Sequence, residues 1–571
     1  MKLLTRQRIQ KWSLAILAPI VFICGCELVF WLAGVHVQMY KGVIPTIEKY
    51  WIVYESGNET GFQRAIPRNY RYFPERLPNF VKNKPGNGLR VFVLGESTTQ
   101  GFPLEIGAFS DWLQVRLSAM LPDKVVEVVN AGNAGWYSEQ ILALFEESLS
   151  LSPDCMIWMS GHNEALDTHV RSLQFEFRQP TIHWLKGKIL NTRTATAISG
   201  LMREQRATVR VEADTEKGVL HDVLPLAKKH FRARLLRAAA LAKKQHVPVI
   251  FCTMPKNVRD CAPTLSVHSE GVLKNAKLRE LWNTSYRAGQ EAHQRGDSMQ
   301  ALTLFAEAER IDPHPANLMY ALAQVHDANA SHALAREYYL RAVEQDGSSV
   351  RAQEWAESTI REVARESGSP LVDVEELFNR NGRLGLAGSE WIIDYAHPSF
   401  IGNEKIADAL IPVLESTLNL SLRRELDIGS GRGRELLGIN RYEGVLSDRA
   451  ECLASIAPLV LSNTVNPLWH RVNERCHALL KRDPSDWEIT CALAFLEVIA
   501  KDYTRARERI ESAISQNYMA LAGLYGYYKT EPAVSQILDQ IGFNSEYLTS
   551  KLRPEDRRAI EQQVKNVTSR R

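Results

Sequence analysis

The sequence predicts an α/β domain built on a parallel sheet, with one helical repeat module inserted into it and a second one following it. Two observations support this prediction. Short apolar runs of strand length alternate with helical patterns over residues 89–420, which is typical of a parallel sheet covered by helices on both faces. A pattern of small residues with a longer period interrupts the alternation and indicates paired helices.

Five strands are expected in the α/β domain, each an apolar run that ends near a turn signal. They cover residues 90–95, 124–132, 155–161, 247–254 and 369–374. Helices are expected at 108–121, 138–151, 226–244 and 401–418, with Ser138 as the N-cap of the second. Because functional groups in such sheets gather at the carboxyl ends of the strands, the residues after each strand are the candidates for a site.

The repeat pattern is clearest between the fourth and fifth strands. Gly289, Ala301, Phe305, Ala308 and Pro313 recur 34 residues later as Ala323, Ala335, Tyr339, Ala342 and Gly347. This period, with small residues where two helices touch, resembles tetratricopeptide repeats. Ala494, Ala506, Ile510 and Ala513 keep the same spacing further along the chain. We therefore expect a repeat insertion at 275–349 and a C-terminal repeat module at 445–545.

Composition limits the class of protein. The chain has 571 residues, too many for one hydrophobic core, and its net charge of +3 gives no argument for nucleic-acid binding. The eight cysteines form no CxxC zinc spacing, so neither a metal nor a cofactor is expected. Cys252 and Cys261 are close enough in sequence to form a disulfide in an oxidising compartment, and buried free thiols are the alternative.

The N-terminus predicts a membrane segment. Four basic residues within the first eleven precede the apolar stretch 13–35, which has the length of a membrane-spanning helix. The basic flank places the N-terminus in the cytoplasm and the rest of the chain outside. An uncleaved anchor, a cleaved signal peptide and lipidation at Cys26 are all open. The localisation expected is the bacterial inner membrane, single-pass, with the main body in the periplasm.

The predicted organisation follows from these segments. It comprises a membrane anchor or signal segment (1–35), an extended linker (36–88), the α/β domain (89–420, interrupted by 275–349), a polar linker (421–444), the C-terminal repeats (445–545) and a charged tail (546–571).

Four short motifs follow strands of the predicted sheet. "LGESTTQG" contains Ser97, "NAGNAGW" contains Gly132 and Gly135, "SGHNEA" contains Asn163, and "DYAHPS" contains Asp394 and His397. Each motif alone is a common turn or cap. Together they supply a nucleophile, a base, a carboxylate to orient it and donors for an oxyanion, which is the set that acyl transfer requires.

In the order and placement of these motifs, the chain resembles the GDSL or SGNH hydrolase superfamily over 89–420, excluding the insertion. The resemblance implies a three-layer α/β/α fold with a serine triad. It implies that Ser97 is the nucleophile, His397 the general base and Asp394 the residue that orients it. Gly135, which fits the family pattern better than Gly132, and Asn163 would form an oxyanion hole with the Ser97 N–H. This chain departs from the family at Glu96 and Glu164, where the family usually has Asp.

A serine esterase or acyl hydrolase is therefore the expected function, with an ester-bearing substrate such as an acylated glycan or lipid. An O-acyltransferase with the same triad and a repeat scaffold with a vestigial hydrolase domain are the alternatives. His162, Trp136 and Trp391 are candidates for the substrate pocket, although packing explains these residues equally well. The repeats are candidates for binding protein partners.

Overall fold

The computed structural model describes residues 51–55, 61–65, 79–81, 83–104, 106–165, 220–347, 350–439, 465–530 and 532–568, together with short stretches between 449 and 463. Within these ranges, no helix is both long and apolar enough to span a membrane. The predicted anchor at 1–35, including Cys26, lies outside the described residues.

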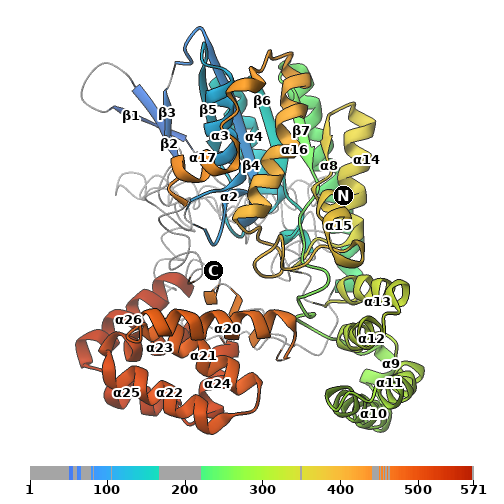
Figure 1. The fold of residues 1–571 in the computed structure, drawn as a ribbon. Coiled ribbons are helices and arrows are strands. Elements are labelled where there is room, and N and C mark those ends of the chain that lie inside the picture. The colour runs from blue at the N-terminus through green and yellow to red at the C-terminus, as the bar shows by residue number, and fades with distance from the viewer. Residues whose placement is uncertain are drawn as a thin grey trace, which may run out of the picture. The chain divides into compact units, whose positions relative to one another are not determined.

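A five-stranded parallel sheet forms the centre of the α/β domain (Figure 1). Its strand order is β5-β4-β6-β7-β8. The strands are β4 (Gly88–Gly95), β5 (Val125–Asn130), β6 (Cys155–Met159), β7 (Val249–Cys252) and β8 (Leu371–Val372). All five lie within or overlap the predicted strands. Every residue of β6 and β7 is buried, which explains why these segments read as continuous apolar runs rather than as alternating patterns.

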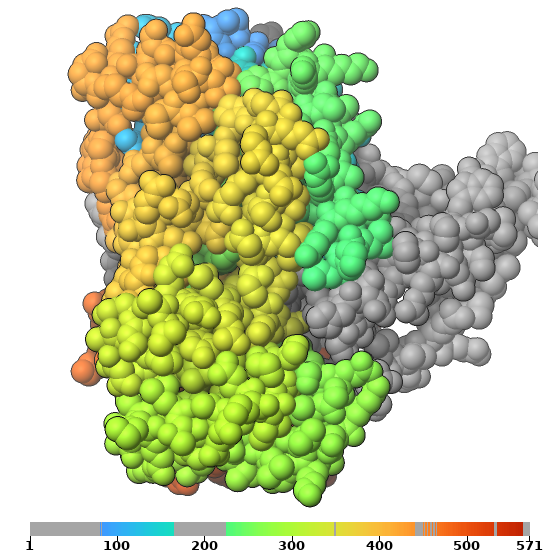
Figure 2. Space-filling view, turned by 90° about the vertical axis from the view of Figure 1, so that its right-hand side faces the viewer, coloured from blue at the N-terminus to red at the C-terminus, as the bar shows by residue number. Residues whose placement is uncertain are grey.

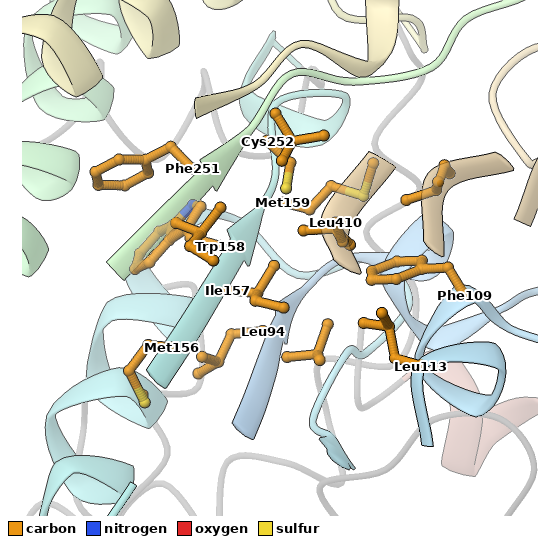
Figure 3. Packing of buried hydrophobic residues seen from close by; sticks show 14 of the residues in the cluster. Leu94, Phe109, Leu113, Met156, Ile157, Trp158, Met159, Phe251, Cys252 and Leu410 are labelled. Atoms are coloured by element: carbon orange, nitrogen blue, oxygen red, sulfur yellow. The ribbon is translucent and has the colours of Figure 1, made fainter. Parts of the chain in front are cut away.

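Two groups of helices pack against opposite faces of this sheet. On one face, Phe145 of α4 contacts Trp158 of β6, with ring centroids 5.9 Å apart. On the other face, the backbone N–H of Phe109 in α3 donates to Asn403 of α16 over 3.0 Å. Figure 3 shows Trp158 and Phe251 on one side of the strands, and Phe109, Leu113 and Leu410 on the other. The helices are α3 (Phe109–Met120), α4 (Ser138–Ser148), α8 (Leu220–Lys244), α14 (Glu354–Ser367) and α16 (Phe400–Leu418).

The predicted extended linker at 36–88 contains regular structure. Residues Trp51–Glu55 (β1), Gly61–Ala65 (β2) and Asn79–Val81 (β3) form a small antiparallel sheet. The run "WIVYE" of β1 is rich in the aromatic and β-branched residues that favour strands. In these residues the predicted extended linker therefore includes strands that pair with one another.

The insertion consists of two helix pairs, which Figure 1 shows as ribbons, and its surface is the yellow-green lower half of Figure 2. They are α10 (Ala276–Gln294), α11 (Ser298–Ile311), α12 (Ala316–Ala328) and α13 (His332–Glu344). A Cβ atom on Gly289 would lie 2.6 Å from the Phe305 ring, so the close approach of α10 and α11 requires glycine there. This contact explains the small residue in the repeat pattern.

Residues 421–439 of the predicted polar linker are described, and they pack against the α/β domain. Residues Gly429–Leu436 form α17, and Ile439 lies in the core of the α/β domain. Arg116 of α3 donates to Asp427 over 2.9 Å, and a Cβ atom on Gly433 would lie 2.4 Å from the Trp112 ring. Gly433 therefore allows α17 to pack closely on α3, whereas a Cβ atom on Gly429 or Gly431 would meet nothing within 4 Å.

The described residues of the C-terminal module from 467 to 568 form helices joined by short turns and loops. Its helices are α20 (Pro467–Arg482), α21 (Trp487–Ile499), α22 (Tyr503–Gln516), α23 (Tyr518–Thr530), α24 (Pro532–Gln540), α25 (Ser545–Lys551) and α26 (Pro554–Thr568). The charged tail forms α26, and Tyr525 of α23 donates a hydrogen bond to Glu561 over 2.9 Å.

Candidate active site

Ser97 lies where β4 turns into a short helix, α2 (Ser97–Gln100). Gly95, the last residue of β4, lies close to β6. A Cβ atom on Gly95 would lie 2.0 Å from the carbonyl oxygen of Met159, so glycine is needed at this position. Ser97 is the first residue of the helix, so its backbone N–H has no partner within the helix. The residue is partly exposed, whereas its neighbours Glu96 and Thr98 are buried. The sequence thus presents a hydroxyl and a backbone donor at the carboxyl end of the sheet.

His397 and Asp394 lie on the loop between α15 (Val374–Asn381) and α16, and they meet Ser97 in space. His397 Nε2 is 2.8 Å from Ser97 Oγ, and His397 Nδ1 is 2.7 Å from Asp394 Oδ2. The other carboxylate oxygen, Asp394 Oδ1, accepts the backbone N–H groups of Ala396 and His397, each over 2.9 Å. Ser97, His397 and Asp394 therefore form a continuous hydrogen-bonded relay, although 300 residues separate Ser97 from His397 in sequence.

The environment of Asp394 keeps it ionised. Burial alone would raise the pKa of this carboxyl, but the His397 imidazole and the two backbone donors outweigh burial and hold the pKa below its ordinary value. The His397 ring is flanked by Phe102 and Tyr395, with centroids 4.9 Å and 5.5 Å away. These two aromatic rings were not predicted as site residues, although Tyr395 lies inside the Asp394–His397 motif.

The predicted oxyanion donors lie in two neighbouring loops. Gly135 has a φ of +76°, which favours glycine, and the Asn163 side-chain amide donates to the carbonyl of Trp136 over 2.9 Å. Gly132 instead packs against α2, since a Cβ atom there would lie 2.4 Å from the backbone nitrogen of Gln100. Gly132 therefore has a packing role. Gly135 and Asn163, by contrast, are both partly exposed.

The three candidates for the substrate pocket have structural contacts. His162 is 4% exposed, and its Nδ1 accepts the backbone N–H of Ala352 over 2.9 Å, so the ring proton of the neutral form lies on Nε2. Burial, followed by electrostatic interactions with His397 and Lys256, lowers the pKa of His162 to about 3. Trp391 stacks on Phe378 with ring centroids 5.8 Å apart. Both Trp391 and Trp136 pack against the hydrophobic core of the α/β domain, and a role of these three residues toward a substrate stays a prediction.

Glu96 and Glu164, the two departures from the family pattern, support the loops that hold the oxyanion donors. Glu96 Oε1 accepts the N–H of Gly161 over 2.7 Å, next to the Asn163 loop. Glu164 accepts the backbone N–H and the hydroxyl of Ser138 over 2.6 and 2.9 Å, at the start of α4. Ser138 is therefore not the N-cap that its position suggested; Tyr137 occupies that position, and the Ser138 hydroxyl binds Glu164 instead.

Both buried glutamates have raised pKa values. Burial raises the pKa of Glu96 well above its ordinary value of 4.5, and the nearby Glu164 adds to this, against the backbone donors of the Asn163 loop. Glu96 Oε2 is buried and has no hydrogen-bond partner among the described residues, which further disfavours a charge. A folded-state pKa above the unfolded value means that the folded chain binds the extra proton.

The substitution Glu96→Gln should therefore change how stability depends on pH. As pH rises from 4.5, the ordinary pKa of a glutamate, through the raised folded-state pKa of Glu96, the wild type should lose stability by about 1.4 kcal/mol per pH unit. Gln keeps the neutral shape without a titrating group, so the advantage of Glu96→Gln should grow with pH. Urea unfolding at a series of pH values measures this difference. Glu362→Gln, at an exposed position, is the control, and parallel curves for Glu96→Gln and wild type would contradict the assignment.

Other polar groups near the site have structural partners. Lys256, just after β7, forms a buried ion pair with Glu375 over 2.5 Å and lies 3.5 Å from Glu357. No group of three or more acidic, histidine or cysteine side chains in the described part of the chain could hold a metal ion. Cys252 and Cys261 are buried free thiols, so the disulfide that the sequence left open is not formed.

Comparison with known proteins found solved structures of two kinds that are similar to this chain. No protein-family model matches the chain. Similar solved structures include the lipase/acylhydrolase from Enterococcus faecalis, with 12% identity, coverage of 59% of this chain and 97% of that chain, and a TM-score of 0.28. A GDSL-like lipase from Bacteroides thetaiotaomicron has 11% identity, coverage of 57% and 88%, and a TM-score of 0.25.

A repeat protein is also among the similar structures. The TPR domain of P58(IPK) has 14% identity, with coverage of 73% of this chain and 99% of that chain and a TM-score of 0.16. The chain is therefore similar both to GDSL-type ester hydrolases and to tetratricopeptide-repeat proteins. Because these identities and TM-scores are low, the similarity decides nothing about the reaction, and the function proposed below depends on the geometry of the site.

Proposed function

We propose that this protein is a serine hydrolase that cleaves an ester through an acyl-serine intermediate on Ser97. The observation that supports the proposal most directly is the unbroken relay from Ser97 Oγ through His397 to the buried Asp394 carboxylate. A serine hydroxyl is a weak nucleophile unless a base removes its proton, and His397 Nε2 lies within hydrogen-bond distance of it. Asp394 fixes the tautomer in which Nδ1 donates and Nε2 accepts.

The proposed reaction has two halves. Ser97 Oγ attacks the ester carbonyl while His397 Nε2 takes its proton, and the tetrahedral oxyanion is held by the N–H groups of Ser97 and Gly135 and by the Asn163 amide. The intermediate collapses when His397 protonates the departing alcohol. A water molecule then attacks the acyl-serine, with His397 again taking and returning the proton.

We further propose that the substrate is an ester of the cell envelope, such as an acylated glycan or lipid, reached by an enzyme anchored to the inner membrane with its main body in the periplasm. The basis for this location is the apolar stretch 13–35 and its basic flank. Fusing a reporter that functions on only one side of the membrane to the C-terminus tests the location, and a cytoplasmic signal would contradict it.

Labelling with a fluorophosphonate probe, followed by identification of the modified residue, tests the proposed chemistry. The probe reacts with activated serines, so it should modify Ser97 and no other serine. Incubation with a labelled acyl donor and a glycan then identifies the acceptor. Release of the free labelled acid indicates hydrolysis, whereas labelled glycan would identify an O-acyltransferase with the same triad.

The variant Asn163→Ala should keep a low but measurable activity. Losing one oxyanion donor typically costs about 10²–10³ in rate, or roughly 3–4 kcal/mol of transition-state stabilisation. The measurement is kcat for an ester reporter in Asn163→Ala, with Asn163→Asp as a variant of similar shape that lacks the amide donor. An unchanged kcat in both variants would remove Asn163 from the oxyanion hole.

A further inference from the structure

The loop that carries Asp394 and His397 is attached on one side to the chain that leads into the repeat insertion. The backbone N–H of Asn257 donates to the carbonyl of Tyr395 over 2.9 Å. Asp260 accepts the backbone N–H of Ser389 over 2.9 Å, and Arg259 forms an ion pair with Glu390 over 2.6 Å. These contacts hold the loop before Asp394, at Ser389 and Glu390, and between the two catalytic candidates, at Tyr395.

The C-terminal repeat module holds the same loop from another direction. Arg471, on α20, donates from Nη1 to the carbonyl of Ser389 over 2.6 Å and from Nη2 to the carbonyl of Ile393 over 2.7 Å. The hydroxyl of Ser455 also donates to the Ile393 carbonyl, over 3.3 Å. One guanidinium group therefore ties both ends of the segment 389–393 to the module.

Ile393 links this contact directly to the relay. It is bonded covalently to Asp394, and its backbone N–H donates to the carbonyl of His397 over 2.8 Å. A shift of the Ile393 peptide would therefore move both residues. Tyr395 provides a second link, because it packs against the hydrophobic cluster of the C-terminal module while its ring lies 5.5 Å from the His397 ring.

We propose that the C-terminal repeat module is part of the catalytic apparatus, and that Arg471 is a positioning residue that sets the place of Asp394 and His397 through the Ile393 carbonyl. This inference rests on the proposed function, since it assumes that the relay performs the reaction. Arg471 touches no reacting atom. Its contribution is geometric, and a misplacement of about 1 Å in such a group can cost about 10²-fold in rate.

The test compares kcat and KM for an ester reporter in full-length wild type, Arg471→Gln and Arg471→Lys. Arg471→Gln removes the paired donors, so kcat should fall about 10- to 100-fold, while KM should change less than about twofold. Arg471→Lys keeps the charge but offers one ammonium group to two carbonyls. Its kcat should therefore lie between that of the wild type and that of Arg471→Gln. Arg482→Gln, at an exposed position on the last turn of the same helix, is the matched control and should equal wild type.

The outcomes separate a positioning role from a purely structural one. The folded fraction of each variant is measured by circular dichroism, and kcat is expressed per folded molecule. An unchanged kcat per folded molecule in Arg471→Gln overturns the proposal, whether or not the variant is less stable. If Arg471→Gln does not fold, Arg471→Lys decides by the same criterion.

Fluorophosphonate labelling of the wild type in the same experiment distinguishes failure of the proposed function from failure of the role of Arg471. A wild type that is not labelled at Ser97 overturns the proposed function and this inference with it. A wild type that is labelled, beside an Arg471 variant with unchanged kcat, overturns only the role of Arg471.

Discussion

Ser97→Ala is expected to abolish turnover of an ester reporter such as p-nitrophenyl acetate. The substitution removes the only atom that can form the acyl-enzyme, and His397 is left without the proton that it is positioned to take. Because the members of a serine triad act as a unit, losing the nucleophile typically costs about 10⁴–10⁶ in kcat. The folded state should be little affected, since Ser97 is partly exposed and its side chain is small.

The matched control for this prediction is Ser416→Ala. Ser416 is exposed on α16, and its hydroxyl donates to the carbonyl of Val413 over 3.1 Å. The control should retain wild-type activity and fluorophosphonate labelling, whereas Ser97→Ala should lose both. Full activity in Ser97→Ala would falsify the assignment of the nucleophile.

Asp394→Asn is expected to lower kcat by about 10⁴-fold while leaving the loop folded. The oxygen of the new amide can still accept the backbone N–H groups of Ala396 and His397, which now bind Asp394 Oδ1. The amide NH₂ group then faces His397 Nδ1 and forces that nitrogen to accept. The ring proton moves to Nε2, where His397 can no longer take the proton of Ser97.

Measuring kcat/KM for Asp394→Asn beside its thermal unfolding separates chemistry from folding. Asp123→Asn is the control, because Asp123 is an exposed carboxylate that forms an ion pair with Arg423 far from the relay in sequence. A drop in activity of less than tenfold, with an unchanged unfolding temperature, would contradict the role of Asp394 in fixing the tautomer.

Local sequence patterns predicted the sheet and the relay because each depends on short segments. The apolar run of β4, the turn at Gly95 and the residue types at 97, 394 and 397 are all visible within a few positions. The pairing of Ser97 with His397 could be inferred only because both follow strands of one parallel sheet. The roles predicted for Ser97, Asp394 and His397 then came from the order of the motifs, which resembles that of a known family.

The contacts that hold the site could not be predicted in the same way. Arg471 lies 74 positions beyond His397, and no local pattern indicates that its guanidinium binds the Ile393 carbonyl. The same holds for Gly433, whose small size matters only because the Trp112 ring packs against it. A glycine-rich polar stretch has no regular spacing of apolar residues that would predict a buried face. Its packing on α3 depends on Trp112, which is far away in sequence.

The long interval between Ser97 and His397 has a consequence for synthesis of the chain. The nucleophile is made first, and its base follows only after 300 further residues, which include the whole repeat insertion. Until that stretch has been translated and folded, Ser97 is an ordinary hydroxyl with no base beside it. In the proposed mechanism, a nascent chain that lacks His397 should therefore not hydrolyse esters, and activity should begin only when the α/β domain is nearly complete.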